Sequence, residues 1–204
     1  MEHISVILTG FFSLLATSLA AWFAYNQHTK NKLTDLKMET IKKENEVRYA
    51  ADSRSIAIIY GSLWGLLNKL DVDRCYILQP HPNMKHYYLS INIEVNKNGV
   101  SFVREIIQNF PISEVPDFTK ELGTNCWIFY DNIEEQVKDA RAKSIMKLVG
   151  PKQIAIKQLV NIRGEWVGSL IASSIKESSY NEVDLCKEMK NVANVIQFIL
   201  PPIN

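Results

Sequence analysis

Residues 153–173 read QIAIKQLVNIRGEWVGSLIAS, and this stretch decides the fold. Apolar and branched side chains dominate both halves, as is typical of strands in a sheet. The residues between the halves, 161–164, have the composition of a tight turn. The stretch therefore predicts two antiparallel strands, over 153–160 and 165–173.

Outward from this hairpin, helical and strand patterns alternate along the chain. Apolar residues at helical spacing predict helices, and alternating or aromatic runs predict strands. We expect helices over 56–70, 102–110 and 185–199, a helical region from Asp131 that ends at Gly150-Pro151, and strands over 74–79, 89–95 (half-buried) and 126–130. Ser179, three residues before Glu182, is expected to open the last helix. This order predicts an α+β fold, an antiparallel sheet with the terminal helices on one face.

The whole chain has 204 residues, of which 47% are hydrophobic and 22% charged, and its formal net charge is +1. This size fits one domain with an appended segment, and the composition excludes a disordered, collagen-like or disulfide-dense chain. A near-neutral charge disfavours a dedicated nucleic-acid binder. We therefore expect no nucleic-acid partner.

The N-terminal segment carries no charged residue from Ile4 to Tyr25, a length that can cross a bilayer as a helix. Trp22 and Tyr25 stand where interfacial aromatic side chains are found. A cleaved signal peptide is the alternative, but the basic residues that precede such a segment are missing. We expect residues 1–26 to form one transmembrane anchor in the lipid bilayer.

Basic residues after this segment set its predicted orientation. Lys30 and Lys32 follow it closely, and basic residues beside a membrane span stay on the cytoplasmic side. We expect the N-terminus outside the inner membrane, a helical juxtamembrane stalk over 27–50, and a cytoplasmic domain over 51–204. The stalk lacks glycine and proline, and it is either a coiled coil or a solvated single helix.

Four segments of the C-terminal part carry a family resemblance, namely 127–131, 142–146, 163–171 and 180–184. In this order they resemble a GAF domain, a module for small-molecule sensing and dimerisation. With the preceding helix, the resemblance covers about residues 50–200. It implies a GAF-like antiparallel sheet flanked by helices. A PAS-like domain has a similar rhythm of elements, but it lacks a long helix at each end.

The GAF resemblance places the aromatic strand beside a ligand pocket. It implies that Trp127, Phe129, Tyr130 and Asp131 are ligand-binding residues, and core packing is the alternative for each. Alternation along the strand points Trp127 and Phe129 to one face and Tyr130 to the other. The sequence identifies neither the small-molecule ligand nor a cofactor.

The terminal helices of this domain offer a pairing face. Leu63, Leu66 and Leu70 repeat along the first helix, and Val192 and Ile196 repeat along the last. These side chains pack the helices on the sheet and on each other, or part of the surface also forms a parallel dimer, as GAF helices often do. We expect a homodimer, which membrane tethering favours by raising the local concentration.

No catalytic or metal site is indicated by the sequence. The N-K-F-D-E signature of cyclic-nucleotide-binding GAF members is missing, and His81 and His86 have no third ligand at a useful spacing. Bilin attachment or redox chemistry would need cysteines near the pocket, whereas Cys75, Cys126 and Cys186 lie on predicted strands or the last helix. We expect a protein without enzymatic activity.

These features predict a single-pass membrane protein, bacterial or phage, with a cytoplasmic GAF-like module for small-molecule sensing or regulation. We expect its signal to pass to an unidentified protein partner. The alternative is a structural or membrane-remodelling protein, lysis-type or phage-associated, with a degenerate GAF core that binds no ligand. Ala16, Ala20 and Ala24 would give its membrane helix a small-residue packing face.

Overall fold

The computed structural model describes residues 2–176, 181–201 and 203, and for residues 2–21, 23–25, 29, 31, 33, 35, 36 and 45–50 it describes the backbone alone. The chain divides into two compact units, Met1–Ala51 and Asp52–Asn204. Helix α1 (Glu2–Leu70) makes up the described part of the first unit and contributes residues 52–70 to the second.

The predicted membrane anchor and stalk both fall in α1. The side chains of 4–25, Tyr25 included, lie outside the described residues, apart from that of Trp22, which is exposed. Lys30 and Lys32 are exposed as well. Among the described residues, no helix is both long and apolar enough to cross a membrane. The anchor therefore stays a prediction.

The described residues of the second unit form a six-stranded antiparallel sheet with the strand order β3-β2-β1-β6-β5-β4. Its strands are β1 (Arg74–Asn83), β2 (His86–Asn96), β3 (Phe110–Pro111), β4 (Trp127–Tyr130), β5 (Gln153–Val160) and β6 (Trp166–Ser174). The predicted hairpin is confirmed, because β5 and β6 pair antiparallel along their length. Gly164 in the turn has a φ of 78°, which favours glycine.

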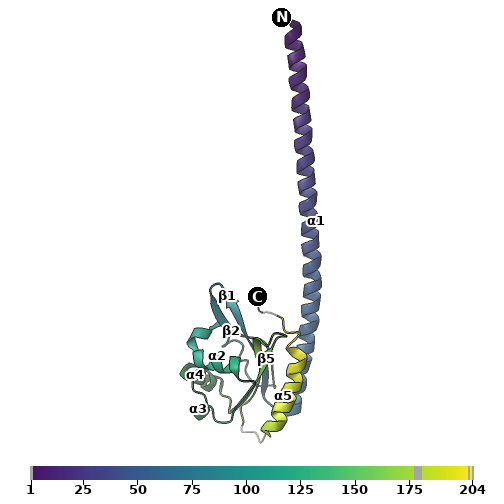
Figure 1. Cartoon of the computed structure of the whole chain (residues 1–204). Coiled ribbons are helices and arrows are strands. Elements are labelled where there is room, and N and C mark those ends of the chain that lie inside the picture. The colour runs from purple at the N-terminus through teal and green to yellow at the C-terminus, as the bar shows by residue number, and fades with distance from the viewer. Residues whose placement is uncertain (1, 177–180, 202, 204) are drawn as a thin grey trace. The chain divides into compact units, whose positions relative to one another are not determined.

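Helices cover both faces of the sheet (Figure 1). The C-terminal part of α1 and α5 (Glu182–Ile196) pack on one face, and α2 (Pro116–Thr124), α3 (Ile133–Gln136) and α4 (Ala140–Val149) pack on the other. A 3-10 turn, Ile112–Glu114, leads into α2. The predicted α+β fold, with the terminal helices on one face, is confirmed.

The two terminal helices bury an apolar layer against the sheet. Leu63 of α1 and Met189 and Ile196 of α5 are fully buried in this layer. Lys69 and Glu188 form an ion pair of 2.7 Å between the same two helices. Full burial of one aliphatic side chain contributes about 1.5–3 kcal/mol. The layer therefore holds α1 and α5 firmly to the sheet.

A β-bulge allows β2 to supply side chains to both faces of the sheet. Asn92 is an extra residue between two pairs of the β1–β2 ladder. Because the side chains change faces there, Ile91 packs on the α4 side and Ile93 on the α5 side. Glu94 then pairs with Tyr76 of β1 and lies on the α4 side. The strand predicted over 89–95 was expected to be half-buried, whereas β2 is buried on both faces.

The predicted helix over 102–110 is wrong, because these residues form an irregular loop that ends in β3. The N–H groups of Ile106 and Ile107 both donate to the carbonyl oxygen of Val103, so the segment makes a single turn, and the Glu94 carboxylate binds the N–H groups of Val103 and Arg104 at its start. Asn109 has a positive φ of 52°. The apolar residues at helical spacing are loop side chains that pack on the sheet.

The predicted end of β1 at residue 79 is also wrong. The strand continues through Pro80 and Pro82, because beyond Leu78 it pairs with β2 alone and a proline there removes no bond to β6.

Helix boundaries differ from the prediction where caps decide them. Pro116 begins α2, which was not predicted. The helical region predicted from Asp131 to Gly150-Pro151 is divided into α3, capped by Asn132, and α4, which Asp139 caps and which ends at Val149. Asn181 caps α5, and the predicted cap Ser179 lies outside the described residues.

Candidate functional site

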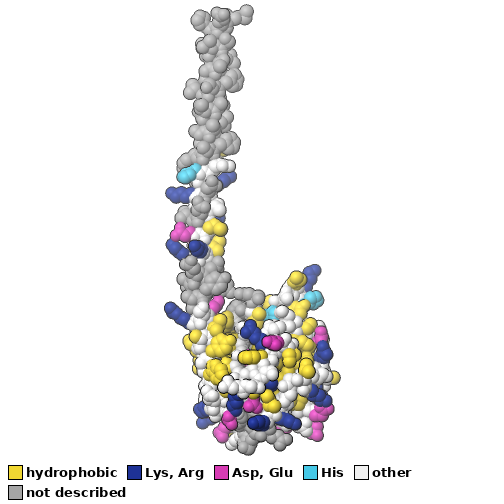
Figure 2. All heavy atoms as spheres, turned by 180° about the vertical axis from the view of Figure 1, so that it is seen from behind, with side chains coloured by type: hydrophobic (Ala, Val, Ile, Leu, Met, Phe, Trp, Pro, Cys, Tyr) yellow, Lys and Arg dark blue, Asp and Glu magenta, His cyan; other side chains and the backbone are white. Residues whose placement is uncertain are grey.

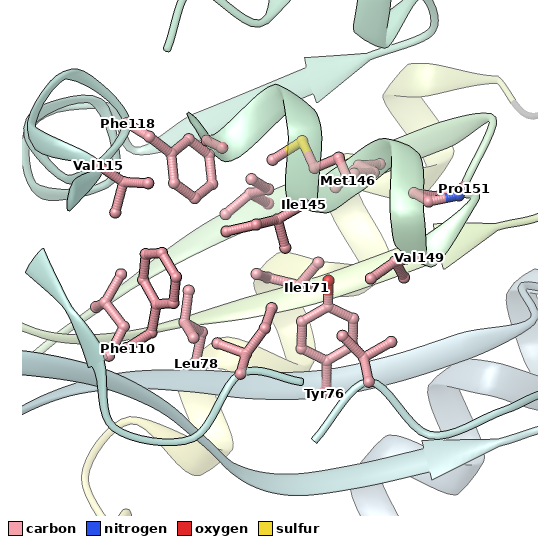
Figure 3. A pocket seen from close by; sticks show the side chains of 16 residues that line it. Tyr76, Leu78, Phe110, Val115, Phe118, Ile145, Met146, Val149, Pro151 and Ile171 are labelled. Atoms are coloured by element: carbon pink, nitrogen blue, oxygen red, sulfur yellow. The ribbon is translucent and has the colours of Figure 1, made fainter. Parts of the chain in front are cut away.

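A cavity of about 50 Å³ lies between the sheet and helices α2 and α4 (Figure 3). Strands form one side of it, and α4, the start of α2 and the loop before β3 form the other. Its apolar lining consists of Leu78, Leu89, Val103, Ile107, Phe110, Val115, Phe118, Ala142, Ile145, Met146, Val149, Pro151, Ile154, Ile156 and Ile171. Such walls favour an uncharged, apolar occupant, because burial of an unpaired polar group costs free energy.

Tyr76 is the polar exception in this lining. Among the 16 lining residues it alone carries a hydrogen-bond donor in its side chain. The residue is 7% exposed, and its hydroxyl points into the cavity near Ile171 and Val149 (Figure 3). Burial raises the pKa of the Tyr76 phenol well above its ordinary value of 10.0, and the Glu94 carboxylate raises it further. The phenol is therefore neutral at physiological pH.

Glu94 fastens the loop that forms one wall of the cavity. The Val103 N–H group donates to Oε1 at 2.9 Å and to Oε2 at 3.1 Å, and the Arg104 N–H group donates to Oε2 at 2.8 Å. The carboxylate is buried, so these charge-assisted bonds replace its hydration. Since Val103 lines the cavity, the position of this wall depends on Glu94.

Arg74 joins the same loop to the end of α4. Its Nε donates to the carbonyl oxygen of Ser101 at 3.1 Å, and its Nη1 donates to that of Val149 at 3.3 Å. The side chain is buried. Arg74 on β1 and Glu94 on β2 therefore hold two walls of the cavity to the sheet.

Asp139 connects α2 to α4 through one buried carboxylate. Oδ1 accepts the N–H groups of Arg141 and Ala142 at 3.0 Å, and Oδ2 accepts the N–H group of Phe118 at 3.3 Å. Because Phe118 and Ala142 both line the cavity, this carboxylate sets the spacing between two of its walls.

The four residues predicted to bind ligand do not line this cavity. Trp127 and Phe129 are half-buried on the α5 side, and the indole N–H of Trp127 donates to Glu182 Oε1 at 2.9 Å. Tyr130 is buried on the α4 side, so the predicted alternation of faces is confirmed. Asp131 is exposed after the end of β4. Ligand binding by these residues stays a prediction.

The predicted pairing face of the helices lies inside the unit. Leu63, Leu66, Leu70 and Ile196 are buried, and Val192 is half-buried against the same core. These side chains join the terminal helices to each other and to the sheet within one chain. A homodimer would therefore need another surface.

The histidines and cysteines do not take part in the cavity. His81 is buried and hydrogen-bonded within the β1–β2 hairpin, while His86 is exposed. The lining includes none of the three cysteines, Cys75, Cys126 and Cys186. Burial raises the pKa of the Cys75 thiol. In the part of the chain that the structure describes, no cluster of three or more His, Cys, Asp or Glu residues could hold a metal ion.

Sequence reasoning missed the residues that build the cavity. Tyr76 and Arg74 lie two positions apart on a strand and so share a face, which was a usable signal. Asp139 before an apolar helical segment is a recognisable N-cap pattern. Glu94 gave no such signal, because only the bulge at Asn92 turns it inward.

Comparisons with known proteins identify the fold. No protein-family model matches the sequence, and no curated protein matches it significantly. Solved structures do match. The GAF domain of PixJ from Thermosynechococcus elongatus, in its blue-light-absorbing form, has a TM-score of 0.56 and 14% identity, covering 72% of this chain and 88% of that one.

Two further solved structures agree. A far-red cyanobacteriochrome photoreceptor has a TM-score of 0.57 at 10% identity, over 80% of this chain and 94% of that one. A phycoerythrobilin-bound GAF domain of a cyanobacterial phytochrome has a TM-score of 0.54 at 16% identity, over 73% of this chain and 91% of that one. The second unit therefore has a GAF-like fold, as the resemblance in sequence implied.

Proposed function

We propose that this protein is a membrane-anchored, non-enzymatic sensing or regulatory protein, whose Asp52–Asn204 unit binds a small molecule in the cavity between the sheet and α4. The observation that carries the proposal is this apolar cavity, in whose lining Tyr76 supplies the single side-chain hydrogen-bond donor. Its small volume favours a compact ligand, since cavities for drug-sized ligands enclose ~300–1,000 Å³. A linear tetrapyrrole, such as the bilin of the phytochrome GAF domain, would need the walls to move apart.

The way the walls are held supports a sensing role. The buried side chains of Glu94, Arg74 and Asp139 hold the loop before β3 and helices α2 and α4 in place together with apolar packing, and these walls lie outside the long strand ladders of the sheet. Elements at the periphery of a sheet open at lower free energy than the central strands do. An occupant of the cavity can therefore shift their population, and a protein partner on this side of the unit would detect the change.

The chemistry of the lining supports binding rather than catalysis. The neutral Tyr76 phenol donates a hydrogen bond, but its raised pKa makes it a poor base or nucleophile at physiological pH. The remaining lining residues offer only aliphatic and aromatic surface. This supports the proposal that the protein carries no enzymatic activity.

Membrane anchoring is the second part of the proposal. The uncharged run over 4–25 and the exposed Lys30 and Lys32 after it support a single span with the Asp52–Asn204 unit in the cytoplasm. Alkaline phosphatase fused after Asn204 should be inactive, while a fluorescent protein at the same position should be bright. An active phosphatase would contradict the orientation.

Association of two copies is the third part, through the exposed side of α1 rather than its buried face. Tyr60 and Trp64, which lie one turn apart, expose large apolar side chains there, and Figure 2 shows hydrophobic side chains gathered over the C-terminal part of α1. Two copies tethered to one membrane would meet at high effective concentration. Sedimentation equilibrium of the full-length chain should give a dimer, and Trp64→Glu should give a folded monomer.

Ligand binding is tested on the full-length chain purified from the cells that produce it. Small molecules released on denaturation are analysed by gas chromatography and mass spectrometry. Ala142→Leu is the matched control, because it adds three carbon atoms to a residue that lines the cavity. The wild type should release a compound that the folded Ala142→Leu variant lacks. Equal release from both proteins, or none from either, would contradict the proposal.

A further inference from the structure

The Tyr76 hydroxyl faces the cavity and has no hydrogen-bond partner among the described residues. The residue is 7% exposed. It lies on β1 opposite Glu94 of β2, and its hydroxyl points into the cavity (Figure 3). A donor that faces an apolar cavity finds no acceptor in the walls, and phenylalanine would fill the same space without an unpaired polar group. The hydroxyl therefore calls for an acceptor inside the cavity.

The surroundings of Tyr76 restrict the charge of that acceptor. Arg74 and Glu94 direct their side chains to backbone groups of the walls, and neither lines the cavity. A charged ligand would have to lose its hydration without a counter-ion. A neutral oxygen, as in a ketone, aldehyde or ether, needs only the one donor that the cavity supplies.

The cavity also restricts size and shape. Apart from Tyr76, the lining is aliphatic and aromatic on all sides, from Leu78 on the sheet to Met146 on α4. A volume of about 50 Å³ admits a compact group of a few non-hydrogen atoms. The remainder of the ligand must then be hydrocarbon.

We propose that the ligand is a small, neutral, mostly hydrocarbon molecule with one hydrogen-bond acceptor, to which the Tyr76 hydroxyl donates. This inference rests on the proposed function, since it names the ligand class of the same cavity.

The test uses acetone and isobutene, which have the same shape and differ by an oxygen in place of a CH2 group. Both compounds are volatile, so equilibration with a gas phase of known composition sets the thermodynamic activity of each compound. This activity does not depend on how much of the compound dissolves in the detergent around the full-length chain. Binding is followed by the methyl signals of Ile145 and Met146, which line the cavity. Tyr76→Phe removes only the hydroxyl, and Tyr87→Phe makes the same change at a residue that is 65% exposed.

Tyr76→Phe should weaken the binding of acetone by about 2- to 12-fold, the range expected for one net hydrogen bond, and should leave that of isobutene within about 2-fold. Tyr87→Phe should change neither. If Tyr76→Phe affects acetone and isobutene alike, or affects neither, the inference is overturned while the cavity remains a binding site. If neither compound shifts the two methyl signals in the wild type, the proposed function fails as well.

Discussion

Asp139 tests how the cavity walls are held, because one buried carboxylate serves both α2 and α4. In Asp139→Ala, the first turn of α4 loses its N-cap, which costs about 0.5–2 kcal/mol. The buried N–H group of Phe118 also loses its acceptor, which costs about 1–3 kcal/mol. The free energy of unfolding should therefore fall by about 1.5–5 kcal/mol.

Asp139→Asn separates the two contributions. The amide oxygen still caps α4, but the amide N–H2 group replaces the acceptor of Phe118, so only about 1–3 kcal/mol should be lost. Asn132→Ala is the control, because it removes the N-cap of the single-turn α3, where the bond to the Glu135 N–H group is 3.4 Å long. It should cost about 0.5 kcal/mol.

The assay is urea unfolding of the full-length chain, combined with amide hydrogen exchange. Both Asp139 variants should accelerate exchange in α2 and α4, while the β5–β6 hairpin keeps its protection. A cost below about 0.5 kcal/mol for Asp139→Ala would refute this account of the walls. Equal costs for the alanine and asparagine variants would show that the carboxylate does not cap α4.

Three further changes have clear directions. Gly61→Ala should raise the free energy of unfolding by about 0.5–1 kcal/mol, because Gly61 is an exposed helical residue and an added Cβ meets nothing within 4 Å. Gly168→Ala should lower the free energy of unfolding by about 1–3 kcal/mol, because its Cβ would lie 3.0 Å from the Leu78 carbonyl oxygen. Urea unfolding should therefore show Gly61→Ala to be stabilising and Gly168→Ala to be destabilising. The hydrogen bond and charge of Lys97 hold the pKa of Asp71 below its ordinary value of 3.8, and an NMR titration of Lys97→Met should return it towards that value. Because this pKa is lowered on folding, the contribution of Asp71 to stability is present above pH 3.8 and is lost as the pH falls through the lowered pKa.

Local signals explain why much of the fold could be predicted. The β5–β6 hairpin depends on a turn whose residues interact with one another, since the Asn161 side chain accepts the N–H groups of Arg163 and Glu165. The terminal helices carry apolar residues at helical spacing that the sheet then buries, as Leu63 and Ile196 illustrate. In both cases neighbours in sequence determine the outcome.

The cavity depends on contacts between residues far apart in the sequence. The spacing over 102–110 looks helical, yet the segment makes only one turn before Asn109 adopts a positive φ, and Arg74 joins the loop to Val149, 75 residues further along the chain than Arg74. The bulge at Asn92, which turns Glu94 inward, leaves no mark in the local pattern. Aromatic content drew the ligand prediction to Trp127, whereas the cavity is built mainly from aliphatic side chains of many segments.

The response of the cavity to xenon tests the central claim most directly. Xenon enters dry apolar cavities without needing a hydrogen bond, and it reports on access to the cavity whatever the natural ligand is. The full-length chain is labelled at its methionine methyl groups, so that Met146, which lines the cavity, is compared with Met84, which is 98% exposed. We predict that the Met146 signal shifts with xenon pressure and saturates, while that of Met84 only drifts in proportion to pressure. A Met146 signal that responds no more than that of Met84 would contradict the account.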